Sequence, residues 1–153
     1  MAIEAPISKF KKNNILIYVG ICIIFAAWFG YDGYLNKKFI QEYSDEDGNP
    51  SSTLIFNQKS PPFFIAGAVL FGIYFSMIKG KKLLADEKEL VFSGKQKIPY
   101  DSIEKIDKTW FDKKGFFVIT YKDENGKEAE RKISDRNYDG LENILNHLVE
   151  KIS

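Results

Sequence analysis

Two long uncharged segments most constrain what this chain of 153 residues can fold into. No Asp, Glu, Lys, Arg or His occurs in residues 15–31 or in residues 61–78. Each segment is about 17–18 residues long, the short end of what an α-helix needs to cross the hydrocarbon core of a bilayer. A soluble chain of this size would have too little remaining protein to cover two such helices. The pattern therefore predicts two transmembrane helices, at residues 14–31 and 61–78.

Aromatic residues at the ends of both segments favour lipid as their surroundings, because such side chains gather at the boundary between membrane and water. They are Trp28, Tyr31, Tyr34, Phe63 and Phe64. The basic residues before the first segment are also typical of a secretory signal peptide. That segment is long, however, and it ends in bulky aromatics without a small-x-small cleavage site. We therefore expect a retained helix.

Lysines that flank the two segments predict their orientation. Three precede the first segment and three follow the second: Lys9, Lys11, Lys12, Lys79, Lys81 and Lys82. Residues 32–60, between the segments, carry three lysines against five acidic residues. Because positive residues are retained on the cytoplasmic side, we expect residues 1–13 and a domain at 79–153 in the cytoplasm, residues 32–60 outside, and the chain in a bacterial inner membrane. The six lysines are also candidate contacts for anionic lipid head groups.

Small residues recur at four-residue spacing in both segments. They are Cys22, Ala26 and Gly30 in the first segment and Ala68, Gly72 and Ser76 in the second. Such stripes let helix backbones approach closely within lipid. The stripes either face each other and close a hairpin, or they face another subunit. Neither segment contains an ionisable carboxylate, amine or imidazole, so nothing in them suggests an ion path or a proton relay.

Residues 32–60 are too many for a tight turn and too few for a domain. We expect the first helix to continue past the membrane for about two or three turns and to break at Gly48 and Pro50. The stretch TLIFNQ, residues 53–58, is expected to be extended. The acidic cluster at residues 45–47 lacks the alternating ligands and the distal Glu of a calcium loop. It is interpreted as a solvated turn.

After residue 78 the apolar pattern changes from helical to alternating, which is typical of strands. Short strands are expected at residues 83–85, 89–92, 97–99, 116–121 and 127–133. The fourth of these is rich in aromatic and β-branched residues, so we expect it in the centre of a sheet. Turns are expected at Ser93 and Gly94, at residues 112–115, and at Asn125 and Gly126, the last as a type I′ hairpin.

An amphipathic helix is expected at the end of the chain. Five apolar residues at helical spacing share one face: Leu141, Ile144, Leu145, Leu148 and Ile152. Asp139 and Glu142 have the spacing of a capping box at its start. The predicted fold class is thus a membrane α-helical hairpin plus an α+β domain. In that domain, about five or six antiparallel strands form a small sheet or partial barrel that the last helix caps.

The order of elements in residues 81–152 carries a family resemblance. Two short strands and a glycine turn lead to the sequence IPYDSI at residues 98–103, then to hairpins and the helix LENILNHLVEKI at residues 141–152. This order, over about half of the chain, resembles the bacterial pleckstrin-homology-like (PH-like) domains. The resemblance implies a small curved sheet capped by a C-terminal helix, often attached to membrane segments, that acts in binding or assembly without catalysis.

Composition and isolated reactive residues limit the function classes. The net charge of +1 argues against a general nucleic-acid binder. The single cysteine, Cys22, excludes an intramolecular disulfide and a zinc site built from several cysteines. His147, the single histidine, is expected to pack at the boundary of the last helix. No phosphate-binding glycine loop or nucleophile elbow occurs, so we expect no enzyme, no cofactor and no metal site.

Trp110 and Phe111 form the candidate partner patch of the domain. They precede the turn expected at residues 112–115, where an exposed aromatic pair could contact lipid or a partner. Alternatively, Trp110 packs on the domain core against the last helix.

Two functions from different classes remain. The first is a non-catalytic interaction module, an accessory or assembly subunit of a larger membrane complex, with other subunits, a second copy or membrane lipids as partners. The second is a membrane-surface sensor that binds anionic lipid head groups through the juxtamembrane lysines together with Lys95 and Lys97. Residues 79–153 carry 16 basic and 15 acidic side chains. This near balance gives weak overall attraction to anions, so we favour the first function.

Overall fold

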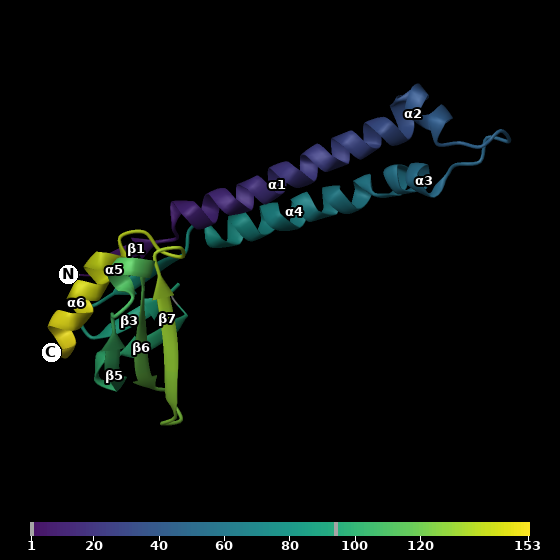
Figure 1. Cartoon of the computed structure of the whole chain (residues 1–153). Helices are drawn as coiled ribbons and strands as arrows, with labels where there is room; N and C mark the ends of the chain where they lie inside the picture. Colours follow the sequence, from purple (N-terminus) through teal and green to yellow (C-terminus); the bar gives the residue numbers. More distant parts are fainter. Residues whose placement is uncertain (1, 94) are drawn as a thin grey trace. The chain divides into compact units, whose positions relative to one another are not determined.

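A computed structural model gives the structure of residues 2–93 and 95–153. The chain divides into two compact units, which we call the hairpin unit (residues 13–76) and the domain unit (residues 1–12 and 77–153). The structure is α+β, with two antiparallel sheets and two long apolar helices (Figure 1). The coarse fold class expected from the sequence is therefore confirmed.

Helices α1 (Lys9–Gly30) and α4 (Pro61–Ile78) lie side by side in the hairpin unit (Figure 1). Aromatic rings pack between them, with 5.5 Å between the ring centroids of Tyr18 and Phe71. With the helical segments that adjoin them, they form two stretches of 27 residues each. Both stretches are long and apolar enough to cross a membrane, and few of their side chains are buried.

The connection between these helices is more helical than the sequence predicts. A π-helical turn, η1 (Tyr31–Leu35), continues α1 and is followed by α2 (Lys37–Glu42). The side chain of Asn36 separates the two, because it accepts a hydrogen bond from the Phe39 N–H at 3.3 Å and so starts a new helix.

Helix α3 (Ser52–Lys59) occupies the stretch that we expected to be extended, so that expectation is wrong. The Ser51 hydroxyl caps its first turn by accepting a hydrogen bond from the Leu54 N–H at 3.3 Å. Leu54 and Asn57, three residues apart, are buried on one face. The helix ends at the proline pair that opens α4, since proline has no N–H to continue the hydrogen-bond ladder.

The π-helical turn η1 packs closely on α3 because Gly33 has no side chain. A Cβ atom at Gly33 would lie 2.9 Å from the carbonyl carbon and oxygen of Asn57. The Tyr34 hydroxyl donates to the Gln58 carbonyl at 2.8 Å, and the Gln58 amide donates to the Gly33 carbonyl at 3.1 Å. Polar contacts therefore close the connecting end of the hairpin unit.

The described strands of the domain unit form two antiparallel sheets, not a single sheet or a closed barrel. In the first sheet the strand order is β1 (Ile3–Pro6), β2 (Lys82–Ala85), β3 (Glu89–Phe92) and β4 (Gln96–Pro99). In the second it is β5 (Ile103–Asp107), β6 (Phe116–Lys122) and β7 (Glu128–Ser134). Strand β6 is central in its sheet, as predicted.

Strand β1, which we did not expect from the sequence, comes from the segment before α1. It pairs antiparallel with β2, so that Pro6 lies opposite Lys82. Ala5 is fully buried in the domain core. The Ile7 N–H donates to the Lys81 carbonyl at 3.1 Å, which extends the pairing by one residue. The N-terminal segment is therefore part of the domain, and the strand pair β1–β2 joins both α1 and α4 to it.

One hydrophobic core contains residues from both sheets and from helix α6 (Leu141–Ile152). Four of the five apolar residues expected on one face of α6 are buried, and Ile152 is partly buried. Phe117 and Ile119 from β6 and Leu90 from β3 are fully buried opposite them. Each fully buried side chain of this size contributes about 1.5–3 kcal/mol relative to an exposed one.

The capping box expected at Asp139 and Glu142 is wrong. Helix α6 begins after Gly140, at φ 73°, without a side-chain cap. The Asp139 carboxylate instead accepts a hydrogen bond from the Lys9 N–H at 3.0 Å, at the start of α1. There the carboxylate satisfies an N–H that has no partner within the helix. Its negative charge also interacts favourably with the positive end of the helix dipole.

Two predicted turns also differ from the structure. A short helix, α5 (Phe111–Lys114), occupies the expected turn at 112–115 and ends at Gly115, with φ 67°. In the hairpin between β6 and β7, Gly126 has a positive φ but Asn125 does not, and a type I′ turn requires both. The Asp123 carboxylate accepts hydrogen bonds from two following N–H groups, which favours a type I turn followed by a left-handed glycine. In the turn expected at Ser93 and Gly94, Ser93 has φ 52°, and Gly94 lies outside the described residues.

Candidate functional site

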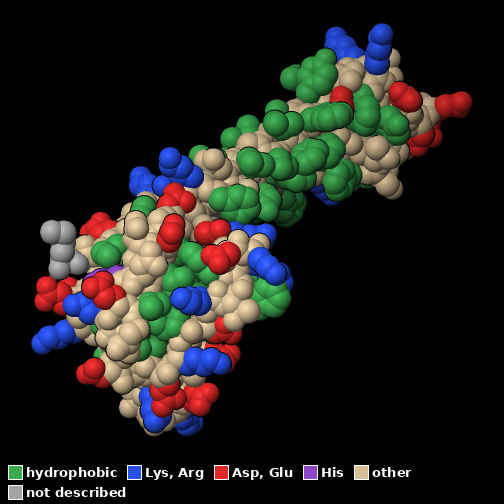
Figure 2. All heavy atoms as spheres, turned by 60° about the vertical axis from the view of Figure 1, so that its left-hand side comes forward, with side chains coloured by type: hydrophobic (Ala, Val, Ile, Leu, Met, Phe, Trp, Pro, Cys, Tyr) green, Lys and Arg blue, Asp and Glu red, His purple; other side chains and the backbone are tan. Residues whose placement is uncertain are grey.

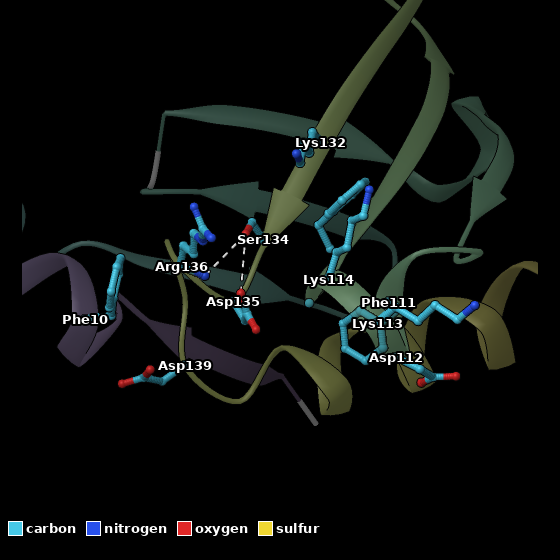
Figure 3. A pocket seen from close by; sticks show the side chains of 12 residues that line it. Phe10, Phe111, Asp112, Lys113, Lys114, Lys132, Ser134, Asp135, Arg136 and Asp139 are labelled. Carbon is cyan, nitrogen blue, oxygen red and sulfur yellow. Dashed lines mark hydrogen bonds between the residues drawn. The ribbon is translucent and has the colours of Figure 1, made fainter.

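An open groove of about 880 Å³ lies in the domain unit (Figure 3). Its walls are α5, the end of β7, the loop at residues 135–139 and the first turn of α1. Aromatic side chains from α1, α5 and the start of β6 border it: Phe10, Phe111 and Phe116. We call it the α5 groove.

Backbone hydrogen bonds hold the walls of the α5 groove together. The Asp135 N–H donates to the Gly115 carbonyl at 2.8 Å and ties the end of β7 to α5. The Ser8 N–H donates to the Asn137 carbonyl at 2.9 Å and ties the same loop to α1. A Cβ atom at Gly115 would collide with the Asp135 carboxylate, and its φ of 67° disfavours any other residue. Glycine is therefore required at this point.

Basic side chains outnumber acidic ones around the α5 groove. The basic ones are Lys113, Lys114, Lys132 and Arg136, and the acidic ones are Asp112, Asp135 and Asp139. Among the described residues, none of these four cations forms an ion pair. The sequence did not single them out, because they come from three separate elements and only the fold brings them together.

The six lysines predicted to contact lipid head groups have different surroundings. Lys9, Lys79 and Lys81 are exposed, whereas Lys11, Lys12 and Lys82 are partly buried. The Lys82 ammonium pairs with the Glu4 carboxylate at 2.5 Å across β1 and β2. The Lys11 ammonium donates to the Asn137 side chain at 3.4 Å. Contact with lipid remains a prediction for all six.

The two predicted stripes of small residues do not simply face each other. Cys22 lies against Gly67, where a Cβ atom would be 3.4 Å from the cysteine sulfur. Gly30 lies near the Pro61 ring, at 3.8 Å by the same measure. No described atom lies within 4 Å of a Cβ built at Gly72. Ala26 and Ala68 are partly buried and Ser76 is exposed, so part of the second stripe is free of contacts within the chain.

The predicted partner patch is divided between core and surface. The side chain of Trp110 is 43% exposed. Phe111 is partly buried, and its ring meets that of Phe117 edge-on, with centroids 6.0 Å apart. The Lys114 ammonium lies over the Trp110 ring, 4.3 Å from its centroid. Trp110 is therefore the accessible member of the pair.

His147 and Tyr100 converge on one carbonyl of the domain unit. The Tyr100 hydroxyl, in the 3-10 turn η2 (Tyr100–Ser102), donates to the Asp86 carbonyl at 2.6 Å. His147 Nε2 lies 3.1 Å from the same oxygen. Burial, aided by the carboxylates of Asp86 and Glu89, raises the pKa of Tyr100 to about 12. These contacts tie α6 to the loop after β2.

The acidic turn of the connecting loop satisfies its own hydrogen bonds. The Asp45 carboxylate accepts from the Asn49 N–H at 2.7 Å and from the Asn49 amide at 3.0 Å. These bonds lower the pKa of Asp45 from its usual value. In the described part of the chain, no group of three or more His, Cys, Asp or Glu residues is placed to hold a metal ion.

Comparison of the chain with protein-family models, with curated proteins and with solved structures gives no match.

Proposed function

We propose that this chain is a non-catalytic interaction module, anchored in a bacterial inner membrane by α1 and α4. In this proposal it is an accessory or assembly subunit of a larger membrane complex. The observation that carries it is the exposure of large apolar side chains along both helices. Examples are Ile24 (61%), Trp28 (59%), Leu70 (67%) and Met77 (63%).

Lipid accounts for this exposure better than water does. Figure 2 shows hydrophobic side chains running along the helices of the hairpin unit. Leaving one such side chain in water forgoes about 1.5–3 kcal/mol of burial, and many are exposed together. A bilayer removes this cost, and a helix satisfies its own backbone hydrogen bonds there.

The pairing of β1 with β2 supports placing both chain ends on one side of the membrane. Residues 3–6 and 82–85 are neighbours in one sheet, so helices that leave this pair and cross a bilayer must leave in the same direction. The lysines next to the pair favour the cytoplasmic side. The connecting loop, with its excess of acidic residues, then lies outside.

Two further features support docking of other proteins. The open position at Gly72 leaves part of the small-residue stripe of α4 available to another membrane helix. Trp110 presents an exposed indole on the domain unit, and tryptophan is among the residues most enriched at binding hot spots. The extra strand β1 brings the first sheet to four strands, and two antiparallel sheets with one C-terminal helix also support the proposed PH-like character.

Site-specific photo-crosslinking in native membranes tests this function. A photoreactive amino acid replaces Trp110 in one chain and Asn125, at the β6–β7 turn, in a matched control. We expect a discrete crosslinked protein only from position 110. The same protein should co-purify with the unmodified chain after gentle detergent extraction. A chain that stays solitary after extraction and forms no crosslink from position 110 contradicts the proposal.

A further inference from the structure

Two of the four cations of the α5 groove, Lys114 and Lys132, have aromatic neighbours instead of acidic partners. The Lys114 ammonium lies over the Trp110 ring at 4.3 Å, and the Lys132 ammonium lies over the Phe116 ring at 3.7 Å. Such rings hold an ammonium group in place without neutralising its charge. Both lysines therefore remain available to an anion that enters the groove.

The acidic residues of the groove neutralise these cations only in part. The Asp139 carboxylate is engaged by the backbone N–H of Lys9. Asp135 lies against Gly115, with the Ser134 hydroxyl 3.4 Å from its carboxylate. Figure 3 shows Asp112 at the far end of the groove from Arg136. With four basic and three acidic side chains around it, the groove keeps one excess positive charge.

The position of Phe10 links the groove to the start of a membrane-length helix. Phe10 lines the groove, is 55% exposed and belongs to the first turn of α1. The apolar run of the same helix begins at Ile15, about 7–8 Å further along at 1.5 Å per residue. The polar head-group layer on each side of a bilayer is about 5–8 Å thick. Along α1, Phe10 itself is therefore within reach of that layer.

We propose that the α5 groove binds the phosphate of an anionic membrane lipid, with Lys113, Lys114, Lys132 and Arg136 as its ligands. Arg136 offers a planar fork of donors to phosphate oxygens, and the lysines add point charges. Phe10 lies beside the lipid at the level of the head groups. The inference rests on the membrane placement in the proposed function.

A lipid fits this groove better than an acidic protein segment does. The groove combines cations with exposed aromatic carbon next to a membrane-length helix, which is the composition of a membrane interface. These cations also differ from the six juxtamembrane lysines, of which Lys82 already has an acidic partner.

Retention of lipid by the full chain in mild detergent, measured by native mass spectrometry, tests the inference. The probes are phosphatidylglycerol, zwitterionic phosphatidylcholine, soluble glycerol phosphate and the acidic peptide hexaglutamate. In the groove variant, Lys113, Lys114, Lys132 and Arg136 are all changed to Gln. The matched control changes four exposed lysines outside the groove to Gln: Lys88, Lys105, Lys108 and Lys127. A third variant, with the three groove lysines changed to Arg, keeps the charge.

We expect the wild-type chain to retain phosphatidylglycerol over phosphatidylcholine, and the groove variant to lose about tenfold or more of that affinity. The control and the arginine variant should keep the preference, and glycerol phosphate should bind more weakly than the lipid. Equal retention by the groove variant and the control overturns the inference.

Two other outcomes also overturn it. Glycerol phosphate binding as tightly as the lipid would make the groove a site for a soluble phosphate. Groove-dependent binding of hexaglutamate without lipid preference would make it a site for acidic protein. Failure of the proposed function is distinguishable from all of these. Without the membrane placement the intact chain would stay in solution without detergent, and without partner docking position 110 would form no crosslink.

Discussion

The hairpin unit and the domain unit place their apolar side chains in opposite ways. In the domain unit Phe117 and Leu148 have no exposed surface, whereas in the hairpin unit Phe63 is 78% exposed and Leu70 is 67% exposed. Phenylalanine and leucine occur in the core of one unit and on the surface of the other, so residue type alone does not explain the difference. This is the difference that the proposed membrane anchor requires: water drives the domain core together, and helices in lipid need no such core.

The same phenylalanine truncation in both units gives the largest expected contrast. Phe117→Ala leaves a cavity in the domain core and should lower its free energy of unfolding by about 3–5 kcal/mol. Phe63→Ala removes an exposed ring and should change that free energy by less than about 0.5 kcal/mol. Amide hydrogen exchange of β6 in the detergent-solubilised chain measures both. Equal effects would mean that Phe63 is covered, and the contrast between the units would fail.

A charge introduced into the hairpin unit tests directly whether lipid surrounds its helices. Leu70→Lys, near the middle of α4, should cost about 2.5–3.5 kcal/mol of membrane insertion. A larger share of the chain than in the wild type should then appear in the alkaline extract of membranes, because only α1 is left as an anchor. The control Leu35→Lys lies at the end of the helix, where the ammonium group can reach water, and should stay in the pellet. If both variants stay in the membrane pellet, α4 does not cross the bilayer at Leu70.

The junction at the start of α1 gives an intermediate effect. Ser8 is fully buried, and its hydroxyl accepts a hydrogen bond from the Lys11 N–H at 3.1 Å. Ser8→Ala should destabilise the domain unit by about 1–2 kcal/mol, because a helix cap and a buried hydrogen bond are lost. Ser52→Ala, an exposed serine in the first turn of α3, should have almost no effect on the domain. Denaturant unfolding of both variants measures the free energy of unfolding. If Ser8→Ala leaves that free energy unchanged, α1 is not fixed to the domain through this cap.

At neutral pH the smallest effect is expected from Tyr100, because its contribution to the pH dependence of stability appears only in alkaline solution. Because the folded chain raises the pKa of Tyr100 to about 12 from a usual value of 10.0, folding favours the protonated phenol. Stability is fully present below pH 10 and should fall as the pH rises from 10 towards 12. Ultraviolet absorbance of tyrosinate, combined with unfolding curves, detects it. Tyr100→Phe should flatten the stability curve in this window, and a wild-type curve that is already flat contradicts the assignment.

The sequence predicted those elements whose signals are local. The uncharged runs gave α1 and α4, the spacing of apolar residues gave the buried face of α6, and alternation gave most strands of residues 82–133. Helix α3 was missed, and residues 53–58 were predicted to be extended. The structure has a helix there because a serine cap and burial of Leu54 favour it. The capping box failed because Asp139 satisfies a different helix, 130 residues away in sequence.

The α5 groove could not be predicted from the sequence either, because contacts between distant residues assemble it. Lys113, Lys132 and Arg136 belong to different elements, and their convergence requires the positive φ of Gly115 and the contact of the loop after β7 with α1. Trp110, by contrast, was singled out from residue type and its position before a turn, and its role in binding a partner stays a prediction. Isolated residues with unusual chemistry can be read from a sequence, but charges gathered by tertiary contacts cannot.

The position of β1 has a consequence for the order of events during synthesis. Residues 3–6 are synthesised before their partner strand, which follows almost 80 residues later, after both apolar helices. Strand β1 must therefore stay unpaired while α1 and α4 are synthesised. The domain can fold completely only after residues 77–153 have been synthesised. A chain expressed from residue 79 onward lacks the edge strand β1.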